Sequence, residues 1–141
     1  MRLYKRCRPC NAVPAMWKKI LLFLPGALLL SGCAGTFTNL TPLQQTRNAN
    51  NLYPVEVAFN TSQQSFRWES IQPYVLADGQ PYSMRPTPLM QNRWEGFVPA
   101  LPGTNIVMFR YKFDYKFNNV GTAPKSDSVY SPEYKLSIVD Q

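Results

Sequence analysis

Hydrophobic and polar side chains alternate along much of the chain after residue 52, with the period of a β-strand. Residues 106–118 show this most clearly, because aliphatic or aromatic side chains stand at every odd position from Val107 to Phe117 and mostly polar or charged ones at the even positions. A helix with this pattern would scatter its aromatic side chains around the whole circumference. The pattern therefore predicts a long central strand with one face in the core and the other in water.

Shorter runs of the same kind predict further strands. They lie at residues 53–59, 71–77, 81–84, 93–98 and 134–139. Between them, residues 99–105 and 118–127 are rich in turn-forming residues and are expected to be connections. About six strands in about ninety residues, with no convincing helix, predict a single all-β domain of antiparallel sandwich type.

The dipeptide Asp78-Gly79 lies between two of the predicted strands. Both central residues of the favoured two-residue turn need a positive φ, so this pair predicts a β-hairpin that places Val75 opposite Tyr82. Pro73 and Pro81 have no N–H to donate, which places the hairpin at the edge of a sheet.

The order of these elements favours an immunoglobulin-like sandwich, and a transthyretin-like sandwich is the alternative. The long alternating strand and the short last strand resemble the closing strands of immunoglobulin-like domains, including starch-binding-type modules. After residue 10 the only cysteine is Cys33, so no disulfide is possible within the domain. The sixteen aromatic residues after Cys33 are expected to supply the core.

The beginning of the chain has a different pattern. Residues 1–19 are basic, residues 20–30 (ILLFLPGALLL) are apolar and uncharged, and small residues follow. This order is typical of a secretory signal peptide. A membrane-spanning helix is the alternative, but eleven residues span only about 16 Å of a hydrocarbon core of about 30 Å. Pro25-Gly26 also interrupts any helix there.

The residues Leu30-Ser31-Gly32-Cys33 resemble the lipobox of bacterial lipoproteins. The resemblance implies that a diacylglyceryl group is attached to the Cys33 sulfur, that the chain is cut between Gly32 and Cys33, and that the new amino terminus receives an acyl chain such as palmitate. A covalent lipid would also explain an unpaired cysteine in a secreted protein. Cys7 and Cys10, a C-x-x-C pair in the basic leader, are interpreted as incidental.

This resemblance defines the expected organisation and location. Residues 1–32 are the lipoprotein signal peptide, residues 33–51 are the lipidated cysteine with a polar tether, and residues 52–141 are the β-sandwich. An ordered segment held by Phe37 or Leu40 is the alternative to the tether. Ala34 after the cysteine implies outer-membrane localisation if the source is Gram-negative. The domain itself resembles small uncharacterised lipoproteins with an immunoglobulin-like sandwich, which implies no particular activity.

Composition limits the chemistry. Six of the fifteen Lys and Arg residues precede residue 20, and all eight acids follow Cys33, so the folded part is nearly neutral and is not expected to bind nucleic acid. The chain has no His, and Cys33 is assigned to lipid, so no Ser-His or Cys-His pair can form. The four candidate carboxylates occupy strand positions whose side chains are expected to point into solvent. They are Glu56, Glu69, Glu95 and Asp114. We therefore expect no enzyme, no metal site and no cofactor besides the lipid on Cys33.

Three surfaces are candidates for binding. Trp68 and Trp94 each have charged neighbours, which fits either a glycan-stacking platform or a core side chain. The even face of the long strand, from Arg110 to Lys116, is expected to be a solvated face, with an acidic partner or anionic lipid as the alternative. The edge hairpin at Asp78 is a candidate for strand pairing with a partner. The expected function is a membrane-anchored accessory or structural subunit that contacts another cell-envelope protein. The alternative is a surface carbohydrate-binding module.

Overall fold

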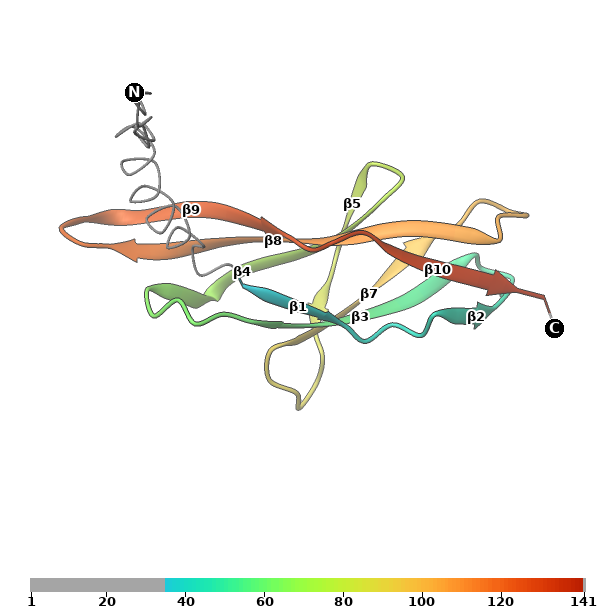
Figure 1. Ribbon diagram of the computed structural model, residues 1–141, viewed down its shortest axis with the longest axis horizontal. Helices are drawn as coiled ribbons and strands as arrows, with labels where there is room; N and C mark the ends of the chain where they lie inside the picture. The colour runs from blue at the N-terminus through green and yellow to red at the C-terminus, as the bar shows by residue number, and fades with distance from the viewer. Residues whose placement is uncertain (1–34, 141) are drawn as a thin grey trace, which may run out of the picture. The chain divides into compact units, whose positions relative to one another are not determined.

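The computed structural model describes residues 35–140, and these residues form strands and connections without a helix (Figure 1). The signal peptide, the lipobox and Cys33 lie outside the described residues. The strands are β1 (Thr36–Asn39), β2 (Gln44–Thr46), β3 (Leu52–Asn60), β4 (Phe66–Ala77), β5 (Gln80–Ser83), β6 (Arg85–Pro86), β7 (Arg93–Pro99), β8 (Ile106–Asn119), β9 (Thr122–Tyr130) and β10 (Tyr134–Val139). Within the described range, no helix is long and apolar enough to cross a membrane.

The strands form two sheets in the order of an immunoglobulin-like sandwich. One sheet has the order β1-β3-β7-β6, and the other has the order β2-β10-β8-β4-β5, with β9 also paired to β8. If β1, β3, β7 and β6 are taken as strands A, B, E and D, and β10, β8 and β4 as strands G, F and C, the two sheets are A-B-E-D and G-F-C. β2 and β5 are added at the two edges of the second sheet. The prediction of an all-β sandwich is confirmed, and its strand order is the one that the immunoglobulin-like arrangement requires.

Aromatic side chains from the two sheets meet in the core. Phe59 of β3 and Phe113 of β8 lie with their ring centroids 5.3 Å apart, and Trp94 of β7 meets Phe113 edge-on at 4.9 Å. Phe59 and Phe113 are almost completely buried. Because β3 and β8 alternate strictly, each buries one set of side chains, and apolar packing holds the sheets together.

The predicted β4–β5 hairpin is confirmed. Asp78 and Gly79 both have positive φ, 50° and 77°, and Val75 pairs with Tyr82. β5 is the last strand of its sheet, so Pro81 lies in an edge strand as expected.

The tether predicted for residues 34–51 is wrong for its described part, because β1 and β2 lie within it. β1 pairs with β3 in one sheet, and β2 pairs in parallel with β10 in the other. Phe37 packs 4.8 Å from Phe59 and 5.1 Å from Phe113, so the alternative interpretation is correct for Phe37. The pattern was hard to recognise because both strands are short and bury few side chains.

The crossover between β1 and β2 is fixed by the buried hydroxyl of Tyr111 in β8. This oxygen lies 2.9 Å from Asn39 Oδ1, 3.1 Å from the Glu56 carbonyl oxygen and 3.0 Å from Thr41 Oγ1. Thr41 Oγ1 in turn accepts a hydrogen bond from the Glu56 N–H at 2.9 Å. Burial raises the pKa of the Tyr111 phenol well above its usual value, so the hydroxyl keeps its proton.

The connection predicted at 118–127 is also corrected. Only Val120-Gly121 forms a turn, and β9 starts at Thr122 and pairs with β8 as far as Lys112. Nearly every β9 side chain is exposed, so the strand has no apolar alternation that would reveal it. We call residues 115–126, the outer part of the β8–β9 hairpin between Asp114 and Asp127, the arm.

Candidate functional site

Trp94 belongs to the core. Only 8% of it is exposed, and its ring packs edge-on against Phe113. Its interpretation as a core side chain is confirmed, and it offers no open face to a sugar ring.

Trp68 is different, because 39% of it is exposed. It lies near the start of β4, where its ring contacts Phe66 at a centroid distance of 5.0 Å and Phe59 at 6.2 Å. Its neighbours Arg67 and Glu69 form an ion pair at 2.8 Å beside it. The indole therefore covers one end of the aromatic core and leaves part of its surface free for an apolar or flat ligand.

The four candidate carboxylates all take part in ion pairs. Glu56 and Glu95 are opposite each other on β3 and β7, and this like-charge pair is offset by Arg93, 3.2 Å from Glu56, and Arg85, 2.8 Å from Glu95. The sequence did not show that Glu56 and Glu95 are neighbours, because the register of β3 on β7 is a tertiary property.

Glu69 and Asp114 have lowered pKa values. The pKa of Glu69 is lowered by a hydrogen bond from its own backbone N–H and by Arg67. Burial alone would raise the pKa of Asp114, but hydrogen bonds from Ser128 and Lys112 hold it below its usual value. Such carboxylates are charge partners rather than proton donors near neutral pH. Within residues 35–140, no group of three or more Cys, Asp or Glu side chains is arranged to hold a metal ion.

A groove of ≈ 460 Å³ lies beside the crossover from β1 to β2. Leu40, Pro42 and Pro54 give it an apolar lining. Its charged members are Glu56 and Glu95, which already have arginine partners. The groove therefore offers mainly apolar contact and no free charge from these two carboxylates.

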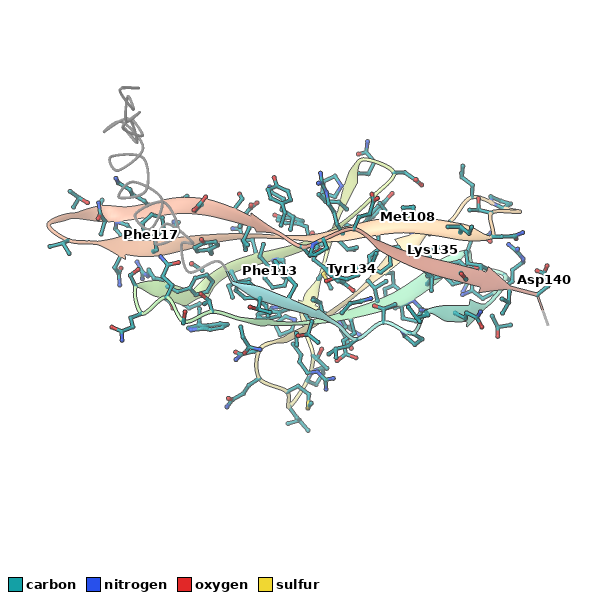
Figure 2. The ribbon with its side chains drawn as sticks, viewed as in Figure 1. Met108, Phe113, Phe117, Tyr134, Lys135 and Asp140 are labelled. Atoms are coloured by element: carbon teal, nitrogen blue, oxygen red, sulfur yellow. The ribbon has the colours of Figure 1, made fainter. Side chains whose placement is uncertain are left out.

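The outer face of the six-stranded sheet gathers exposed and partly buried apolar side chains from four strands. We call it the β8 face. Figure 2 labels Met108 on β8 and Lys135 on β10, which are cross-strand partners on this face. Its apolar members are Tyr74, Leu76, Ile106, Met108, Tyr130 and Val139, from β4, β8, β9 and β10. Ile106, Met108, Tyr130 and Val139 are each 40–49% exposed.

Two basic side chains of β8 lie along this face and stack on its tyrosine rings. The Arg110 guanidinium lies 5.2 Å from the centroid of the Tyr130 ring, and Lys112 Nζ lies 5.8 Å from that of Tyr74. Lys112 also bonds Asp114 at 2.9 Å, which raises its pKa. Cation–π contacts of this kind hold long side chains flat along a surface.

The β8 face has the composition of a protein interface, in which tyrosine, methionine and arginine are enriched. Arg110 and Lys135 form no ion pair within residues 35–140, so the face is positive overall. The prediction of an ordinary solvated face considered only the charged even positions of β8. In the sequence, only Ile106 and Met108 indicated an apolar surface on this side of β8. The other apolar members come from β4, β9 and β10, and they lie beside β8 only because of strand pairing.

These features define an immunoglobulin-like β-sandwich with one mixed apolar and basic face and one half-exposed tryptophan. No protein-family model, curated protein or solved structure matches the chain significantly.

Proposed function

We propose that the protein is a bacterial lipoprotein, anchored by acylated Cys33, whose domain binds another cell-envelope protein through the β8 face. It acts as a non-catalytic accessory or structural subunit, in the outer membrane if the source is Gram-negative. One observation supports the protein-binding role. Exposed Met108, Ile106 and Tyr130 lie on the same sheet face as Arg110, whose guanidinium stacks on the Tyr130 ring. The sequence of the lipobox supports the anchor.

The net positive charge of the β8 face favours a partner with acidic residues around an apolar centre. Apolar contact at Met108 and Ile106 would supply affinity, and Arg110 and Lys135 would orient the partner. The edge strand β5, beside Asp78, is a weaker candidate. It has only four residues, and Pro81 removes one of its donors.

Site-specific photo-cross-linking in intact cells tests this proposal. A photo-reactive residue replaces Met108 in the full-length protein, and the matched control carries it at Phe97. Phe97 is 52% exposed, and it lies on the outer face of the opposite sheet. We expect one dominant envelope protein to be linked at position 108 and not at 97, and the product to disappear in Cys33→Ser. Equal linkage at both positions, or background proteins alone, would contradict the proposal.

The anchor has its own test. Cells that express the full-length protein are fed an alkyne analogue of palmitate, and the wild type is compared with Cys33→Ser. We expect the label and membrane fractionation in the wild type and neither in the variant. Labelling that persists in Cys33→Ser would show that the lipid is carried elsewhere.

A surface carbohydrate-binding module is the second candidate, because Trp68 leaves part of its indole free. Trp68→Ala should then abolish glycan binding on an array while the unfolding transition stays cooperative. Trp94→Ala is the matched control, since loss of this buried ring should unfold the domain. Wild-type protein that binds no glycan would remove this candidate.

A further inference from the structure

The chain joins the fold close to the proposed acylation site. The Gly35 backbone lies against the ring of Phe59, where a Cβ atom would overlap the ring, and β1 begins at the next residue. Only Ala34 separates Gly35 from Cys33, so their Cα atoms are two residue steps apart, at most about 7 Å. An acyl group on Cys33 would therefore hold one end of the sandwich close to the bilayer surface.

The arm lies at this same end. Thr36, the first residue of β1, pairs with Asn60, the last residue of β3. The next strand, β4, begins at Phe66, which pairs with Phe117 in the arm. Figure 1 shows the β8–β9 hairpin extending beyond the β3–β4 connection on the side where β1 starts.

The arm has the side chains of a membrane-surface element. Val120 at its tip is 98% exposed. Lys116 and Lys125 are exposed and form no ion pair within residues 35–140, and the arm contains no acid. The half-exposed indole of Trp68 lies near its base, against Phe66. Apolar tips, tryptophan and unpaired lysines together favour the boundary between anionic headgroups and acyl chains.

We infer that the arm docks on the anionic bilayer surface, with Val120 in the interfacial layer and Lys116 and Lys125 at the lipid phosphates. This inference rests on the proposed acylation of Cys33, which brings this end of the domain to the membrane. Two contacts, the acyl chains and the arm, fix the orientation of the domain. The β8 face around Met108 is then left free for a protein partner.

A polarity-sensitive fluorophore at the tip of the arm tests the inference. The full-length, acylated Val120→Cys protein is labelled and reconstituted in vesicles of phosphatidylcholine and phosphatidylglycerol. Leu101→Cys is the matched control, because Leu101 is 72% exposed in the connection at the opposite end of the strands. We expect a blue-shifted emission that lipid-borne quenchers reduce at position 120, and neither effect at 101.

The lysines supply the second measurement. Lys116→Gln and Lys125→Gln should each lower the ratio of membrane-inserted to free label about fivefold. Vesicles of phosphatidylcholine alone remove the attraction of both lysines, so there the ratio should fall roughly 25-fold. The fold should be unchanged, because both side chains are exposed.

The outcomes separate the two proposals. Label that stays in water at position 120 while the protein stays on the vesicles overturns the docking of the arm and leaves the anchor intact. The same emission at positions 101 and 120, or a shift that appears only with a protein partner, also overturns it. Protein that leaves the vesicles with Cys33 unmodified overturns the anchor and the inference together.

Discussion

The two halves of β8 have the same alternating pattern and different surroundings. Val107, Phe109, Tyr111 and Phe113 are at most 4% exposed, because the four-stranded sheet lies opposite them. Tyr115 and Phe117 continue the same parity, yet both are partly exposed. They belong to the arm, in which β8 pairs with β9 and which extends beyond most of the sandwich (Figure 1).

The difference shows that alternation determines which side chains share a face, but not whether another layer covers that face. In the first half, burial stabilises the fold. In the second half, Tyr115 packs at the margin of the core, 4.4 Å from the ring of Phe66, and Phe117 is only partly covered, so the same residue types leave part of their surface exposed.

The largest expected effect concerns the core half. Phe113→Ala removes a ring that contacts Trp94, Phe59 and Phe37, and should lower the free energy of unfolding by about 3–5 kcal/mol. The matched change Phe117→Ala should cost about 1 kcal/mol, because that ring is already partly in water. Urea unfolding of the two variants measures both values. Equal losses would contradict the distinction between the halves.

Gly35→Ala tests how firmly the chain before β1 is held. The added methyl group would overlap the buried Phe59 ring, so we expect a loss of about 1–3 kcal/mol. Amide exchange should accelerate in β1 and much less in the arm. As the control, Gly121→Ala in the arm has open space around its Cβ but a φ of 72°, and should cost about 1 kcal/mol there. Unchanged exchange in β1 would show that this segment is loosely attached.

Tyr111→Phe removes the hydroxyl that holds the crossover from β1 to β2. Asn39 and Glu56 lose a partner, so the free energy of unfolding should fall by about 1–2 kcal/mol. Urea unfolding near neutral pH measures this loss. A cost near zero would mean that Thr41 alone is sufficient to hold the crossover.

Tyr111 also predicts a pH dependence. Its folded-state pKa is raised by burial above the unfolded-state value of about 10, so its contribution is fully present below that pH. The contribution is lost as pH rises beyond 10 toward the folded-state pKa. Wild-type stability should fall more steeply in this alkaline range than that of Tyr111→Phe. Parallel curves for the two proteins would contradict the assignment.

The smallest effects are expected at the exposed tip and face. Val120→Ser should change the free energy of unfolding by no more than about 0.5 kcal/mol, because Val120 is 98% exposed. Met108→Ser should cost no more than about 1 kcal/mol, because Met108 is 43% exposed. Their consequences should appear in membrane contact for Val120 and in partner cross-linking for Met108. A large stability loss in either variant would show that the side chain packs in the fold instead.

Much of the sandwich was predictable where a pattern is carried by neighbouring residues. The alternation of β3 and β8 identified Val57, Phe59, Phe109 and Phe113 as core, and Asp78-Gly79 determined the register of β4 on β5. Turn preference and side-chain alternation depend only on consecutive residues. Each strand and turn can therefore be predicted without knowing which strands lie beside it.

The candidate sites were less predictable. Trp68 and Trp94 have similar charged neighbours in sequence, yet one is half-exposed and the other is buried, because Trp94 lies within the core whereas Trp68 covers one end of it. The β8 face was missed because its members come from four strands. The clustering of Met108 with Tyr130 depends on pairings that no single segment encodes.

The sequence by itself determined the class of fold, the main core face of β8 and the hairpin at Asp78, since these follow from side-chain period and turn chemistry. Only the tertiary structure decided that β1 and β2 attach to both sheets and that β9 extends the hairpin of β8. These strands are held by backbone hydrogen bonds to neighbours and a few contacts such as Phe37 with Phe59, and their own side chains lie mostly in water. A strand that is held mainly by hydrogen bonds to the edge of a sheet needs few apolar side chains. Its sequence therefore shows little of the alternation that predicts a strand.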